Sequence, residues 1–67
     1  MMDLWWKDKA YKQILYHGEY GVGEVKRPFG AIYIAVPWWQ EDNKHFESEE
    51  EAKSWLATVY RLEHSTN

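Results

Sequence analysis

The side chains that most often carry out chemistry are sparse in this sequence of 67 residues. Cysteine is absent, so neither a thiol nucleophile nor a thiolate metal site can form. The three histidines, His17, His45 and His64, are not spaced as metal ligands on one element. Ser48 lies beside carboxylates, but its position is that of a helix N-cap. We therefore expect no enzymatic activity, no metal site and no cofactor.

Glycines gather between residues 18 and 23, where they superficially resemble a phosphate-binding loop. No helical pattern follows them, and a phosphate cradle depends on the helix N-terminus that comes next. Gly18-Glu19 has instead the composition of a type II′ hairpin turn. Gly21 and Gly23 then predict a β-bulge, or a place where a helix or an aromatic ring approaches the strand closely.

Acidic side chains are concentrated late in the chain. Residues 1–40 carry five Lys and Arg against four Asp and Glu, a charge of +1, whereas residues 41–67 carry three against seven, a charge of −4. A solvated loop and a dipole-matched helix start account for this cluster, which is the favoured interpretation. The sharper hypothesis is that Glu41, Asp42 and Glu47 form an acidic rim that meets a basic partner or mimics nucleic acid.

The best strand pattern covers residues 31–39, AIYIAVPWW, where β-branched and aromatic residues dominate. Successive side chains of a strand point to opposite faces. The aliphatic face is expected to be core, and it comprises Ile32, Ile34, Val36 and Trp38. The other face carries Tyr33 and Trp39 and is interpreted as a contact surface.

Two further strands are expected over residues 11–17 and 20–27, joined by the glycine turn. Arg27-Pro28-Phe29-Gly30 predicts a second turn before the central strand. A three-residue loop there pairs Arg27 with Ala31, whereas a two-residue spacing sets Val25 opposite Ile32. Because a slip of one residue exchanges the faces, the faces of the second strand stay open.

A helix is predicted over about residues 49–63. Ser48 and Glu51 have the spacing of a capping box, and acids fill the first turn. Trp55, Leu56 and Val59 follow at helical spacing. The fold expected for residues 1–67 is one small α+β domain, a three-stranded antiparallel sheet packed on one C-terminal helix. Whether residues 1–10 form a strand or an irregular arm is undecided.

One helix covers one sheet face, so the face with Tyr33 and Trp39 is expected to meet a partner. These two residues, with Trp5 or Trp6, are the predicted apolar anchors, because Trp and Tyr are enriched at interface hot spots. The partner is expected to be another protein, or a second copy in a homodimer. Nucleic acid is less expected, because the net charge is −3.

The segments VKRPFGAIYIAV and HFESEEEAKSWLATVY resemble AP2-type and integrase arm-binding DNA domains. The resemblance covers roughly residues 20–60 and implies a sheet packed on one helix, with the outer face of the sheet entering the DNA major groove. It identifies Lys26 and Arg27 as the alternative, DNA-binding residues. The other outer-face positions of that family correspond to Val25, Tyr33 and Ala35, which lack the donors and acceptors for base readout.

The whole chain also resembles short accessory proteins of phages and prophages, through its tryptophan-rich start, glycine-spaced hairpin and capped helix. This resemblance implies a protein that inhibits or modulates a host protein, possible targets including CRISPR complexes. No secretory signal or membrane-spanning run is visible, so a cytoplasmic location is expected, in the host if the protein is phage-encoded.

Overall fold

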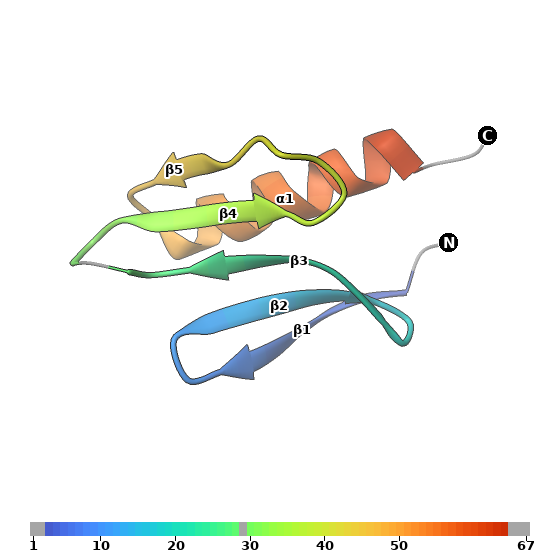
Figure 1. Cartoon of the computed structure of the whole chain (residues 1–67), viewed down its shortest axis with the longest axis horizontal. Helices are drawn as coiled ribbons and strands as arrows, with labels where there is room; N and C mark the ends of the chain where they lie inside the picture. Colours follow the sequence, from blue (N-terminus) through green and yellow to red (C-terminus); the bar gives the residue numbers. More distant parts are fainter. Residues whose placement is uncertain (1–2, 29, 65–67) are drawn as a thin grey trace.

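The computed structural model describes residues 3–28 and 30–64, which form five strands and one helix (Figure 1). In chain order these elements are β1 (Leu4–Lys9), β2 (Lys12–His17), β3 (Tyr20–Lys26), β4 (Tyr33–Pro37), β5 (Lys44–Phe46) and α1 (Glu49–His64). The strands form one antiparallel sheet in sequence order. The α+β class and the C-terminal helix are confirmed. The expected three strands become five, since β1 and β5 extend the sheet at its two edges.

Helix α1 begins where the capping pattern places it. The Glu51 backbone N–H donates to Ser48 Oγ at 3.3 Å, which satisfies one of the free donors of the first turn. Three glutamates occupy that turn, and Arg61 and His64 occupy the last, so both ends complement the helix dipole. No helix among the described residues has the length and apolar character needed to cross a membrane.

The helix covers one face of the sheet, lying along β4 and also contacting β3 and β5 (Figure 1). The β1–β2 hairpin forms the edge of the sheet farthest from β5 in the same view. Between the sheet and the helix lies a core of small and medium side chains: Leu15, Val25, Ala35, Ala52, Leu56 and Ala57. Larger residues surround this core and are only partly buried, so the aromatic side chains close its margin.

The prediction that the aliphatic face of β4 is core was wrong. Ala35 is fully buried under the helix, whereas Trp38 is 48% exposed on the other side. The reason is that a helix can pack closely on a sheet only where the side chains beneath it are small. A Cβ on Gly23 would lie 3.1 Å from Leu56 Cδ2, so the helix approaches the sheet where residues are smallest. The bulkier Ile34 and Val36 therefore lie on the face away from the helix.

The β3–β4 register differs from both predicted spacings, because Val25 pairs with Ala35 and Lys26 with Ile34. The connection is thus longer than either loop considered. Arg27 Nε donates to the Gly30 carbonyl at 2.6 Å, and Gly30 has a positive φ of 50°. Phe29 of the predicted turn lies outside the described residues. The observed pairing is shifted by two residues from the pairing that the three-residue loop predicts. A shift of two residues keeps each side chain on the sheet face that this loop predicts.

Both glycine predictions for β3 are confirmed. The register between β2 and β3 shifts between Leu15 and Tyr16, which is the expected bulge. Gly23 faces the helix through Leu56, while Gly21 faces the ring of Trp38, whose Cζ3 would be 2.8 Å from an added Cβ. The bulge thus allows two nearby glycines to receive a helix on one face and an aromatic ring on the other.

The orientation of β4 predicts opposite outcomes for two neighbouring lysine substitutions. Ala35→Lys places an unpaired charge in the core and should cost more than about 4 kcal/mol of unfolding free energy. Ile34→Lys places the same side chain on the outer face and should cost about 1 kcal/mol. Urea denaturation followed by circular dichroism measures both values. Equal losses, or a larger loss for Ile34→Lys, would contradict the observed faces.

Candidate binding surface

Among the described residues, no element covers the sheet face opposite α1, which is called the open face below. One end of it carries an aromatic row of Trp5, Tyr16 and Trp38. Trp5 stacks on its cross-strand partner Tyr16, with ring centroids 4.7 Å apart and planes at 17°. Trp5 Nε1 also donates to the Gly18 carbonyl at 2.9 Å. Trp5 stays 41% exposed despite these contacts, so the row presents rings that are already held in place.

The middle of the open face holds a nearly buried carboxylate. Glu24 is only 8% exposed, and it pairs across the strands with Ile14 on one side and Val36 on the other. Its Oε1 lies 3.2 Å from Lys12 Nζ, and its Oε2 lies 3.9 Å from Lys26 Nζ. A buried carboxylate needs such partners to offset its desolvation. Glu24 therefore fixes the positions of two lysines on neighbouring strands.

The other end of the open face carries a basic row. Lys9 pairs directly with Lys12, and Lys12 pairs directly with Lys26. Like charges placed opposite each other destabilise a sheet. Glu24 supplies one negative charge against these three positive charges, so the row keeps a net charge of 3 − 1 = +2. Two of the lysines offset the desolvation of Glu24, and the row as a whole still carries excess positive charge.

Charge is segregated between the two sides of the molecule. With Lys7 added, the open face carries four lysines against Glu24, a charge of +3. Of the eight basic residues, 8 − 4 = 4 lie elsewhere, and of the eleven acidic residues, 11 − 1 = 10 lie elsewhere. The rest of the chain therefore carries a charge of 4 − 10 = −6. Both counts cover every charged side chain of the sequence and sum to −3. The modest net charge thus conceals a basic sheet face and an acidic remainder.

Three of the predicted aromatic anchors, Tyr33, Trp39 and Trp6, lie on the helix side instead, whereas Trp5 lies on the open face. Tyr33 and Trp39 are partly buried against the core, and Trp39 Nε1 donates to Glu63 at 2.9 Å. Trp6 also packs there, with Lys53 Nζ 5.0 Å from its ring centroid. The outer-face positions implied by the AP2 resemblance also lie on the helix side in the structure. Val25, Tyr33 and Ala35 face the helix, so they are not available for groove contacts.

The acidic residues proposed as a rim are separated from this surface. Glu41 and Asp42 are exposed in the connection between β4 and β5, and Glu47 is exposed just before α1. Glu49, Glu50 and Glu51 occupy the first helical turn, where the helix dipole accounts for them. A role for Glu41, Asp42 and Glu47 in binding stays a prediction.

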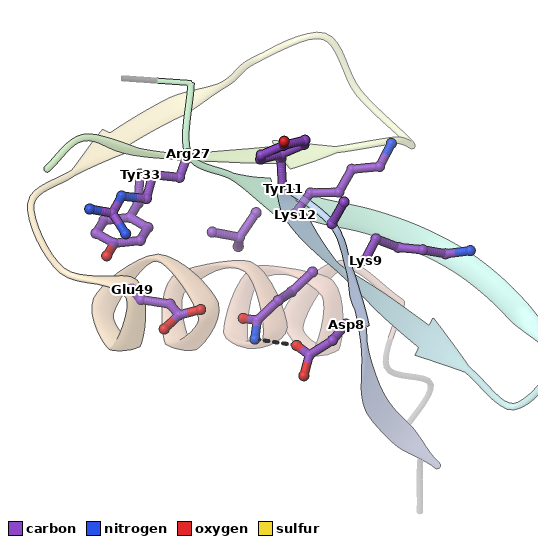
Figure 2. Close-up of a pocket in the computed structure, with 10 residues that line it drawn as sticks. Asp8, Lys9, Tyr11, Lys12, Arg27, Tyr33 and Glu49 are labelled. Atoms are coloured by element: carbon purple, nitrogen blue, oxygen red, sulfur yellow. Dashed lines mark hydrogen bonds between the residues drawn. The ribbon is translucent and has the colours of Figure 1, made fainter. Parts of the chain in front are cut away.

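A polar pocket of about 270 Å³ lies near the start of α1 (Figure 2). Asp8, Gln13 and Glu49 line it together with Arg27 and Tyr33, whose guanidinium carbon and ring centroid are 5.5 Å apart. Gln13 Nε2 donates to Asp8 Oδ1 at 2.6 Å, while Gln13 Oε1 is buried without a partner among the described residues. The pocket offers hydrogen-bond acceptors, and no group of three possible metal ligands occurs in the described ranges.

Aromatic rings close the sheet under the last turn of α1. The Tyr60 hydroxyl and His17 Nδ1 are 2.7 Å apart, and they join the helix to β2. His64 stacks on Tyr60 with centroids 4.2 Å apart, and Trp39 meets both rings edge-on. This cluster has a structural role, because Tyr60 is buried and its polar end is satisfied.

Comparison with protein-family models, with curated proteins and with solved structures gives no match for this chain. Function is therefore inferred from the geometry of the chain's own residues.

Sequence reasoning missed the residues that the open face brings together. Trp5 is among the predicted anchors and Lys26 is among the alternative DNA-binding residues, but Tyr16, Trp38, Lys9 and Lys12 are not predicted as site residues. The available signal was the spacing of Lys7 and Lys9 with Trp5, which places three residues on one strand face. The aliphatic run of β4 is a stronger hydrophobic signal than this spacing, and it predicts the opposite face as core.

The hydrogen bond at the end of α1 gives a second prediction. Tyr60→Phe removes the hydroxyl and leaves His17 Nδ1 without its partner, so the unfolding free energy should fall by about 1 kcal/mol. Tyr11→Phe is the matched control, because that ring is exposed and should change stability by less than about 0.5 kcal/mol. Thermal and urea unfolding measure both. An unchanged stability for Tyr60→Phe would show that the contact contributes nothing.

Proposed function

We propose that the chain is a non-enzymatic binding module that recognises another protein through the aromatic row of its open face. The observation that carries this proposal is the presence of two half-exposed tryptophans, Trp5 and Trp38, on a sheet face without a covering element among the described residues. Trp and Tyr are enriched at the centres of interfaces, where their large rings fill a partner's pockets. Trp5, Tyr16 and Trp38 replace Tyr33, Trp39 and Trp6 as the anchors of the proposal.

Pre-ordering of these rings supports the assignment. Trp5 is held by its stack on Tyr16 and its hydrogen bond to Gly18, and Trp38 lies over Gly21. Immobilising a large side chain during association costs about 0.5–1.5 kcal/mol. Part of that cost is already met in the free protein, so more of the burial energy contributes to affinity.

The biological setting follows the resemblance to phage and prophage accessory proteins. In this setting the partner is a host protein whose activity the module inhibits or modulates in the host cytoplasm, a CRISPR complex being one possible target. The acidic residues Glu41 and Asp42, in the β4–β5 connection, and Glu47, just before α1, would then lie outside the main contact.

Affinity capture from nuclease-treated bacterial lysate tests the proposal. The tagged protein should retain a defined protein partner, and Trp5→Ala/Trp38→Ala should weaken its capture by at least about 30-fold, the size of a hot-spot loss. Tyr20→Ala/Leu62→Ala is the matched control, because both residues are large, apolar and exposed outside the aromatic row. Equal capture by the tryptophan variant and the control would refute the aromatic row as the anchor.

Light scattering of the purified protein distinguishes the homodimer. A concentration-dependent dimer that the same tryptophan variant dissociates would show that the row meets a second copy. Homodimer formation through the aromatic row would then replace the proposal of a different protein partner.

A further inference from the structure

A basic groove of about 530 Å³ lies at the end of the open face farthest from the aromatic row. Lys9, Lys12, Lys26 and Arg27 line it with Tyr11 and Pro28, and no carboxylate is among its lining residues. The groove combines the basic row of the sheet with the exposed β1–β2 turn. Its lining therefore brings three lysines and one exposed aromatic ring together, whereas the Arg27 guanidinium carbon lies over Tyr33, 5.5 Å from the ring centroid.

The composition of this groove is unfavourable for the free protein. Its lysines face one another across adjacent strands, and Glu24 offsets one positive charge among the three. Tyr11 is 84% exposed at the turn, so its ring contributes little to the core. A polyanion would reduce the repulsion between the lysines, and a planar ligand would cover the exposed Tyr11 ring. The two features together indicate a ligand that carries both negative charge and a planar group.

We propose that the basic groove binds single-stranded nucleic acid, with phosphates on the three lysines and an unpaired base stacked on Tyr11. Lys9, Lys12 and Lys26 lie on three neighbouring strands and span about 10 Å, which matches two or three consecutive phosphates. Stacking on an exposed ring requires a base that is free of its own pairing. The groove therefore favours a single strand over a duplex, and it favours nucleic acid over an acidic protein segment, which has no base to stack.

This site is separate from the proposed protein contact. Lys12 and Tyr16 are four residues apart on β2, so the basic groove and the aromatic row lie about 13 Å apart on one face. Variants can therefore remove one site and retain the other. The inference goes beyond the proposed function, because it adds a second ligand of a different class.

Fluorescence anisotropy with a labelled oligothymidylate of about 15 nucleotides tests the proposal on the full chain. With Glu24 included, the three lysines give the groove a net charge of 3 − 1 = +2. The logarithm of the association constant should then fall with the logarithm of salt concentration with a slope of about −1.4, or about sevenfold between 50 and 200 mM. A duplex of the same length should bind more weakly at each salt concentration.

Charge-matched variants separate the groove from overall charge. Lys9→Ala/Lys26→Ala should weaken oligonucleotide binding at least about tenfold and flatten the salt slope. Lys44→Ala/Lys53→Ala changes net charge equally, but both lysines lie over aromatic rings on the helix side, so binding should be nearly unchanged. Tyr11→Ala should weaken binding about tenfold, whereas Tyr20→Ala should not.

Glu24→Gln gives the most specific readout, because it raises the charge of the groove by one while keeping the shape of the side chain. Oligonucleotide affinity should increase, although the loss of two ion pairs gives no gain in stability. A merely structural role for Glu24 predicts weaker binding instead.

Three results would overturn the proposal. They are absence of binding at low salt, equal losses in the Lys9→Ala/Lys26→Ala variant and its Lys44→Ala/Lys53→Ala control, and equally strong competition by polyglutamate, which would assign the groove to acidic proteins. Trp5→Ala/Trp38→Ala should still bind the oligonucleotide. Loss of protein capture with retained oligonucleotide binding, or the reverse, therefore shows which of the two proposals fails.

Discussion

Contact between Leu56 and the backbone of β3 at Gly23 controls the arrangement of the sheet. An added Cβ on Gly23 would lie 3.0 Å from the Val36 carbonyl oxygen and 3.1 Å from Leu56 Cδ2, so the helix seats where the sheet has no side chain. Ala35 lies next to this position and is also fully buried. Close packing of a helix on a sheet gains dispersion energy only where atoms meet at short distance. Gly23 of β3 and Ala35 of β4 therefore lie beneath the helix.

This constraint determines what the opposite face presents. Strand alternation sends Ile34 and Val36 to the open face once Ala35 points to the helix. The same alternation gathers Lys9, Lys12 and Lys26 into a row across three strands. A surface with aromatic rings at one end and cations at the other thus follows from where the helix docks. The chemistry of the proposed sites depends on packing that occurs on the far side of the sheet.

Glu24 connects the stability of the sheet to its proposed function. Its carboxylate is nearly buried between two lysines that would otherwise repel each other across the strands. Replacing it alters stability and ligand affinity together, which makes Glu24 a sensitive test of both. The four lysines of this face outnumber its one buried carboxylate, so a net charge of −3 is compatible with a locally basic surface.

Local interactions were determined by the sequence alone. Ser48 with Glu51 defined the helix start, Gly18-Glu19 defined a hairpin turn, and Gly21 with Gly23 indicated the bulge and the two close approaches. The helix start and the hairpin turn depend on residues that are neighbours along the chain, whereas the glycines indicated close approaches without identifying Trp38 and Leu56 as the groups that make them. Tertiary structure decided which face of β4 meets the helix, how β3 and β4 align, and which side chains share the open face. These features arise because either face of β4 could have packed against the single helix. Hydrophobicity alone favoured the face with the larger aliphatic residues. Close packing instead selected the face with the small residue Ala35.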